Sequence, residues 1–223
     1  MKHLSLYLLT LSLLATTVQC EEADLSTLNN SYRIQCGNLI YSGNRTAVCF
    51  ADKFLQRFKR ETHLEVVPKF KPVRLDSNEI FDTPFCAWSG ENSFKLSEDE
   101  RKNLRDYLIK GGFIISSPGC SDENWDRSFR AEIKAIFPDN ELVKIPMNHL
   151  IFKTVREITR LTTKRKHTTH LEGIFINGRL ALVYTLDGVN EARYAKGCCC
   201  CGGDEITQAS DLNVNILTYA LLY

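Results

Sequence analysis

The sequence lacks several features that would point to common functions. Beyond its N-terminus it has no apolar run near the roughly 20 residues that a membrane-spanning helix needs. It has no glycine-rich phosphate loop of the nucleotide-binding types, so nucleotides are disfavoured and we expect no cofactor. It also lacks an excess of one charge, because 28 Lys and Arg balance 27 Asp and Glu to a formal net charge of +1. This balance argues against nucleic acid as a partner.

The composition that remains is that of an ordinary globular protein. The chain has 223 residues, of which 43% are apolar and 25% are charged. This length suits one domain of roughly 200 residues. We find no internal repeat and no linker, so residues 33–223 are predicted to form a single α/β domain.

The N-terminus has the pattern of an export signal. Met1-Lys2-His3 is a basic start, and residues 4–15 form an apolar core of signal-peptide length. We predict a signal peptide over residues 1–20, a flexible leader over 21–32, and a periplasmic, secreted or envelope-associated protein. Cleavage after Cys20 is one interpretation; the alternative is a lipid anchor at Cys20, as in bacterial lipoproteins. Export places the chain in an oxidising compartment, where cysteines tend to pair.

The stretch 81–120 organises the rest of the chain. Residues 84–90 are typical of a buried strand that ends at a loop. Ser97 and Glu100 form a capping-box pair, which predicts the start of a helix. Residues 113–115 are a second buried strand, so the stretch predicts a βαβ unit of a parallel sheet.

Ligands of open α/β sheets bind beyond the carboxyl ends of the strands. We therefore predict a binding crevice at those ends, formed by Ser89, Gly90, Glu91, Ser116, Ser117 and Asp187.

The other elements are predicted from hydrophobic periodicity and from the positions of Pro and Gly. Asn177-Gly178 is the pair preferred in two-residue hairpin turns, and it predicts a β-hairpin from residues 173–176 and 179–184. Further predictions are helices over 48–60, 125–137 and 206–222, a weakly helical segment ending near 160, strands over 33–41, 64–67 and 142–143, and loops over 68–80 and 187–204.

Short motifs follow one another in an order that resembles a bacterial family, the domain of unknown function numbered 4159. They are Pro84-Phe85, Ser89-Gly90, Leu96-Ser97-Glu98-Asp99-Glu100, Leu104-Arg105-x-Tyr107-Leu108, Gly111-Gly112-Phe113, Phe129-Arg130-x-Glu132-Ile133, Ile136-Phe137-Pro138, His149-x-Ile151-Phe152, Gly178-Arg179-x-Ala181 and Asn213-Val214-Asn215-Ile216-x-x-Tyr219-Ala220-Leu221. The resemblance covers roughly residues 33–223.

This family is similar to class I glutamine amidotransferase-like domains. The resemblance implies a flavodoxin-like three-layer α/β sandwich with a mostly parallel central sheet, to which the sequence patterns above add a C-terminal β-hairpin and a closing helix. It does not imply glutaminase activity, because fold does not determine function. Relatives often carry a His where this chain has Glu91 and acidic residues where it has Ser116 and Ser117. These replacements remove the histidine and the acidic side chains that relatives carry near the predicted crevice.

Cys120 and His149 are the candidate catalytic pair. Cys120 lies just past a predicted central strand, where amidotransferase-like folds carry a nucleophilic cysteine. A nucleophilic thiol needs a base, for which His149 is the candidate, and a group that orients the base, such as Glu91, Asp122 or Asp187. In an exported protein Cys120 is equally a candidate for a disulfide.

The run Cys198-Cys199-Cys200-Cys201 admits two interpretations. Thiolates suit zinc or cuprous copper, but four adjacent side chains do not easily converge on one tetrahedral ion. We therefore predict no metal site, keep these four cysteines as weak candidates, and favour disulfides from this loop to Cys36, Cys49, Cys86 or Cys120. His167 and His170 lie beside the basic run 164–166, which favours a solvated loop over a metal site.

Two functions are consistent with these observations. The first, which we favour, is a non-catalytic exported module that binds a small ligand or a protein of the cell envelope. The second is a thiol-dependent hydrolase or amidotransferase relative that uses Cys120 with His149. The enzyme requires a sulfur and an imidazole within hydrogen-bond range, whereas the binding module does not.

Overall fold

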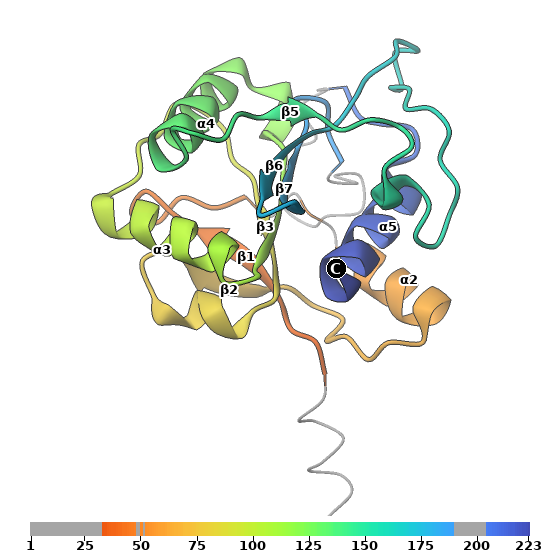
Figure 1. Ribbon diagram of the computed structural model, residues 1–223, viewed down its shortest axis with the longest axis horizontal. Helices are drawn as coiled ribbons and strands as arrows, with labels where there is room; N and C mark the ends of the chain where they lie inside the picture. The colour runs from red at the N-terminus through yellow and green to blue at the C-terminus, as the bar shows by residue number, and fades with distance from the viewer. Residues whose placement is uncertain (1–32, 48–49, 51, 190–203) are drawn as a thin grey trace, which may run out of the picture. The chain divides into compact units, whose positions relative to one another are not determined.

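The computed structural model describes residues 33–47, 50, 52–189 and 204–223, and the described part is built on a seven-stranded sheet (Figure 1). The strands follow the order β2-β1-β3-β4-β7-β6-β5. Neighbours from β2 to β7 pair in parallel, whereas β6 runs antiparallel to both β7 and β5. The strands are β1 (Cys36–Ile40), β2 (Lys71–Arg74), β3 (Phe85–Trp88), β4 (Phe113–Ser116), β5 (Val143–Lys144), β6 (Glu172–Ile176) and β7 (Arg179–Tyr184).

Helices cover both faces of this sheet. One face packs against α2 and α5 and the other against α3 and α4 (Figure 1). The helices are α2 (Lys53–Thr62), α3 (Glu98–Ile109), α4 (Glu123–Ile136) and α5 (Ala209–Leu222), with short 3₁₀ turns η1 (Asn78–Asp82), η2 (Gly119–Ser121) and η3 (Leu150–Phe152).

The pattern of β3 explains why both faces are covered. Phe85 and Ala87 enter the core under α2 and α5, whereas Cys86 and Trp88 enter the core under α3 and α4. Successive side chains of a strand face opposite sides, so an all-apolar strand must be buried on both. The predicted three-layer α/β sandwich, with its mostly parallel sheet, C-terminal hairpin and closing helix, is confirmed.

The central βαβ unit forms as its local sequence predicts. Ser97 Oγ accepts a hydrogen bond from the Glu100 amide at 3.2 Å, and the Glu100 carboxylate accepts one from the Ser97 amide at 2.8 Å. Gly111 follows α3 with φ of 108°, a conformation that favours glycine at helix ends. β3 and β4 then pair in parallel from Phe85–Phe113 onward.

The predicted hairpin also forms. Asn177 and Gly178 both have positive φ, 51° and 80°, as a two-residue primed turn requires. The hairpin lays β7 against β4, with Ser116 beside Tyr184 at their carboxyl ends. Segments that follow β4 and β7 therefore emerge at the same edge of the sheet.

The prediction for residues 64–80 was wrong. The predicted strand at 64–67 contributes only one isolated bridge, from Val66 to Ile34, and the second strand lies inside the predicted loop, as β2. β2 is an edge strand of the sheet. Pro72 lacks an amide hydrogen, which an edge strand tolerates because one of its sides needs no partner.

The weakly helical segment predicted to end near residue 160 was also wrong, since regular helix there is limited to η3. The amides of Val155 and Arg156 donate to Asn215 Oδ1 at 3.0 and 2.8 Å, and Asn215 Nδ2 donates to the Arg156 carbonyl at 2.7 Å. These backbone groups bond to a side chain of α5 in place of helical partners.

Residues Arg33–Tyr223 form one compact unit. None of the helices in the described part of the chain has the length and apolar character that crossing a bilayer requires.

Candidate functional site

Aromatic side chains fill the point where the strand order reverses, between β1 and β3, which is the usual ligand position in such sheets. Trp125 Nε1 donates to the Tyr41 hydroxyl at 2.6 Å, and this hydroxyl donates to the Ser89 carbonyl at 3.3 Å. A Cβ atom added at Gly90 would lie 1.9 Å from the Tyr41 hydroxyl oxygen. The backbone and the aromatic rings are therefore in direct contact where the sequence predicted a crevice.

The serine hydroxyls predicted to line the crevice are buried. Ser116 Oγ donates to the Trp88 carbonyl at 2.9 Å, and Ser117 Oγ donates to the Pro118 carbonyl at 3.4 Å. Ser89, Ser116 and Ser117 are each at most 1% exposed. These three side chains face the protein interior.

Cys120 lies beyond the carboxyl end of β4, in η2, with φ of 57°. Its sulfur is 3.4 Å from Oε1 of Glu91, a half-buried residue. Asp122, a predicted orienting group, caps α4, because its Oδ1 accepts a hydrogen bond from the Trp125 amide at 2.8 Å. The structure thus brings Glu91 to Cys120 and assigns Asp122 to a helix.

His149 lies in a different environment. Its Nδ1 accepts a hydrogen bond from the Ile151 amide at 3.2 Å, and its ring packs against Phe175 and Tyr219. Burial lowers the pKa of His149 below its usual value, since an imidazolium would lose hydration there. This histidine caps a 3₁₀ turn and packs against β6 and α5.

The structure does not bring Cys120 and His149 together. Tyr219, which touches His149, accepts a hydrogen bond at its hydroxyl from the Leu180 amide at 3.4 Å, near the start of β7. Cys120 follows Ser116, which pairs with Tyr184 at the end of β7. A strand rises about 3.3 Å per residue, so Leu180 and Tyr184 lie roughly 13 Å apart along β7. The contacts of His149 lead to the Leu180 end, and Cys120 lies beyond the Tyr184 end.

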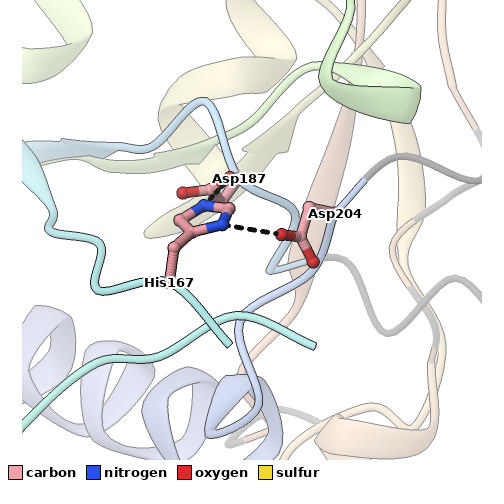
Figure 2. A group of neighbouring side chains, drawn as sticks. All are labelled: His167, Asp187 and Asp204. Atoms are coloured by element: carbon pink, nitrogen blue, oxygen red, sulfur yellow. Dashed lines mark ion pairs between the residues drawn. The ribbon is translucent and has the colours of Figure 1, made fainter. Parts of the chain in front are cut away.

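A different set of side chains meets at the carboxyl edge of β7: His167, Asp187 and Asp204 (Figure 2). His167 Nε2 lies 3.6 Å from Asp187 Oδ1, and His167 Nδ1 lies 3.3 Å from Asp204 Oδ2. We call these three residues the His-Asp-Asp cluster. Asp187 is the one member that the sequence placed in the crevice.

Backbone pairing explains why residues so far apart in sequence meet here. Asp187 follows β7, and the next residue, Gly188, donates its amide to the Asp204 carbonyl at 2.8 Å. The Lys164 amide donates to the Glu205 carbonyl at 2.9 Å. Asp204 is thereby held between the end of β7 and the turn that carries His167.

Each carboxylate of the cluster has one oxygen bonded to the protein and the other directed at His167. Asp204 Oδ1 accepts hydrogen bonds from the amides of Arg165 and Glu205, at 3.2 and 2.9 Å. Asp187 Oδ2 accepts one from the Thr169 hydroxyl. The inward oxygen of Asp204, Oδ2, is buried and has no hydrogen-bond partner.

Asp204 is only 7% exposed, whereas the His167 side chain is 55% exposed. Burial by itself would raise the pKa of Asp204, but hydrogen bonds from the Thr163 hydroxyl and the Arg165 amide lower it overall. Asp204 is therefore a carboxylate at neutral pH, at the bottom of a cluster that opens to solvent through His167.

The sequence reading missed this cluster because it took His167 as part of a solvated loop and did not single out Asp204. One signal was available: Asp187 and Asp204 are the two ends of the predicted cysteine-rich loop. When packed elements hold both ends of a loop, the two ends often lie close together. This would have suggested that the carboxylates of Asp187 and Asp204 are neighbours.

A family model described as a domain of unknown function, DUF4159, matches residues 38–221. The chain belongs to the DUF4159 family. No curated protein matches it. Its resemblance to this family, inferred from the order of motifs, is confirmed.

An open groove of about 480 Å³ in the DUF4159 domain adjoins the cluster. It is lined by Arg160, Thr162, Thr163, Lys164, Lys166 and Thr207. Thr163 belongs to both sites, since its hydroxyl oxygen lies 3.1 Å from His167 Nδ1. Lys164 forms an ion pair with Glu205, whereas Arg160 and Lys166 form no ion pair with a residue in the part of the chain that the structure describes.

The described cysteines of the DUF4159 domain fall into two groups. Cys36 and Cys86 are free and fully buried, and burial raises the pKa of both thiols, to about 12 for Cys86. Cys120 is not among the free cysteines. Cys49 and the predicted weak metal ligands Cys198, Cys199, Cys200 and Cys201 lie outside the described residues.

Proposed function

We propose that this DUF4159 domain is a non-catalytic module, exported to the cell envelope, that binds a small anionic ligand in the groove beside β7. The observation that carries the proposal is the groove itself, which is open and lies next to the carboxyl edge of the sheet. Arg160, Lys166 and the hydroxyls of Thr162 and Thr207 are donors that suit carboxylate or phosphate oxygens.

The proposal follows from where polar groups remain accessible. The hydroxyls of Ser116 and Ser117 bond to carbonyls inside the protein, and the aromatic rings pack so closely on Gly90 that a Cβ atom there would lie 1.9 Å from the Tyr41 hydroxyl oxygen. The groove beside β7 offers both space and charge. It also offers backbone support, because the Thr207 amide donates to the Thr162 carbonyl at 2.7 Å between two of its lining residues.

Calorimetric titration of the purified protein with inorganic phosphate and with citrate tests the groove. The double variant Arg160→Gln, Lys166→Asn removes two charged donors, and Asn tolerates the positive φ of 67° at Lys166. We expect at least one anion to bind saturably and the variant to bind it about tenfold more weakly, the loss of one charged hydrogen bond.

The matched control is Lys102→Gln, which removes an exposed cation from α3 and is expected to leave the affinity unchanged. Absence of binding for both anions, or equal affinity in the double variant, would overturn the groove as the ligand site.

The alternative function is a thiol-dependent hydrolase or amidotransferase relative using Cys120 with His149. Its support is the left-handed backbone at Cys120, with φ of 57°, since such strain clusters at active sites. Against it stands the placement of the two side chains near opposite ends of β7: the contacts of His149 lead to Leu180, whereas Cys120 follows the strand that pairs with Tyr184.

We further propose that Cys120 forms a disulfide with a cysteine of the run 198–201. The Ser121 hydroxyl donates to the Asp204 carbonyl at 3.5 Å, so the chain returns beside Cys120 shortly after that run. Cys36 and Cys86 are buried free thiols and are removed from the pairing. Among the other cysteines that follow Cys20 in the sequence, Cys49 and the run 198–201 remain as candidate disulfide partners of Cys120.

A peptide mass map of the exported protein, alkylated without reduction, tests the disulfide and the N-terminus together. We expect a cross-linked peptide containing Cys120 and a first residue after Cys20. A lipid on Cys20 would instead identify the anchored form. A freely alkylated Cys120 would overturn the disulfide and favour the thiol enzyme.

A further inference from the structure

We propose that the His-Asp-Asp cluster is a binding site for a divalent transition-metal ion. The inference goes beyond the anion groove, because metal binding needs neither the groove nor its ligand. It is carried by the arrangement of hydrogen bonds around the two carboxylates, whose other oxygens form ion pairs with His167 (Figure 2).

Both carboxylates are held as metal ligands usually are. In such sites the ligating oxygen is free, and the other oxygen is bonded to neighbouring groups that orient it. Asp204 Oδ1 is held by two backbone amides and Asp187 Oδ2 by the Thr169 hydroxyl. The remaining oxygen of each carboxylate faces the imidazole of His167.

Asp204 supplies the second, independent observation. Asp204 is only 7% exposed, and its Oδ2 atom is buried and accepts no hydrogen bond. A buried carboxylate oxygen that accepts no hydrogen bond is poorly compensated for its lost hydration, and its nearest charged neighbour here is His167 Nδ1, at 3.3 Å. A cation among the three side chains would give this oxygen a full charge partner.

The donor set indicates which cation. Each of the three residues offers one ligand atom, and these three atoms lie within 4.8 Å of one another. Small side-chain rotations would bring them to the shorter spacing of ligands around one ion. Two carboxylates and a neutral imidazole carry two negative charges, and mixed oxygen and nitrogen ligands suit Zn²⁺ or Mn²⁺. The exposed His167 leaves a path for the ion and open positions for water.

The competing explanation is an ion-pair cluster in which a protonated His167 bridges two carboxylates. Such a bridge satisfies the same distances without a metal. The two explanations differ in one observable, which is saturable binding of a divalent ion that depends on all three residues.

Mn²⁺ titration followed by electron paramagnetic resonance is the test, because bound Mn²⁺ loses the sharp signal of the free ion. Mn²⁺ prefers oxygen and nitrogen ligands, so thiolates at residues 198–201 do not compete for it. We expect one Mn²⁺ per chain, with Asp204→Asn and His167→Gln each weakening binding about 100-fold, at the upper end of losses seen around metal sites.

His170→Gln is the matched control for His167→Gln, since both histidines are exposed and belong to the same stretch of chain. It should bind Mn²⁺ like the unmodified protein. If Asp204→Asn fails to fold, the more exposed His167 keeps the test decisive.

Two results would overturn the proposal: no stoichiometric Mn²⁺ binding to the intact protein, or binding that survives His167→Gln unchanged. Competition with Co²⁺ adds a check on ligand type. Co²⁺ that displaces the bound Mn²⁺ and at the same time shows a thiolate-to-cobalt absorption band would assign the ion to cysteines and reject the His-Asp-Asp cluster. The anion titration of Arg160→Gln, Lys166→Asn is independent of all these outcomes.

Discussion

At the scale of single residues, Gly90 is the position near the filled crevice where any side chain would collide with its neighbours. A Cβ atom there would lie 1.9 Å from the Tyr41 hydroxyl oxygen and 2.7 Å from Trp125 Nε1. Both rings are buried and bonded to each other, so neither can move aside without losing that hydrogen bond. Gly90 is therefore required by close packing between backbone and side chain.

We predict that Gly90→Ala lowers the free energy of unfolding by about 1–3 kcal/mol, the usual cost of overpacking a dense core. Urea denaturation followed by tryptophan fluorescence measures the change. Ser93→Ala, an exposed position a few residues away, serves as the control and should change stability little. Equal stability of Gly90→Ala and the unmodified protein would show that the crevice has room after all.

Single residues also show what sequence alone can and cannot predict. Ser97 and Asn177 were predicted correctly because the capping box and the primed turn depend on neighbours within a few positions. His167 and Asp204 were not connected, because their meeting depends on how β7 and α5 pack. Ser116 ends an apolar strand, and sequence does not reveal whether its hydroxyl faces water or a carbonyl.

At the scale of elements, the same division separates correct from wrong predictions. β3, α3 and β4 were found because apolar runs and end signals are local and strong. β2 was missed because Pro68 and several basic residues favoured a loop over 68–80, and only the order of the sheet reveals that a strand containing Pro72 lies at an edge. No pattern within one element contains that information.

The missing helix after η3 has a comparable cause. Asn215, on α5, takes the hydrogen bonds that a helix through Val155 and Arg156 would have used. A helical tendency in a short segment is worth little, because starting a helix is costly, and tertiary bonds override it. The sequence therefore predicts the central unit of this fold better than its second half.

At the scale of the whole domain, the two ends of β7 have different roles. Its carboxyl end leads to the His-Asp-Asp cluster and to the groove, whereas its start lies near Tyr219 and His149. The sequence placed Cys120 and His149 in one hypothetical site because motif order carries no distances. Sheet topology separates them, and it leaves His149 as a residue that joins η3, β6 and α5.

Because His149 is half-buried at this position, we expect the stability of the domain to rise with pH. Burial lowers the pKa of His149 in the folded protein below the unfolded value of about 6.5. Between the two pKa values the unfolded chain binds more protons, so stability rises with pH. The contribution is fully present above about pH 6.5 and is lost as pH falls through that value toward the folded pKa.

His149→Asn isolates this effect, because asparagine keeps a side-chain acceptor at the cap of η3 but does not titrate. Urea unfolding of both proteins at pH 5 and pH 7 measures the difference. We expect the unmodified protein to lose more stability between pH 7 and pH 5 than the variant does, and His170→Asn to behave like the unmodified protein. Parallel pH dependence in all three would show that His149 is not desolvated, and would remove the packing role assigned to it.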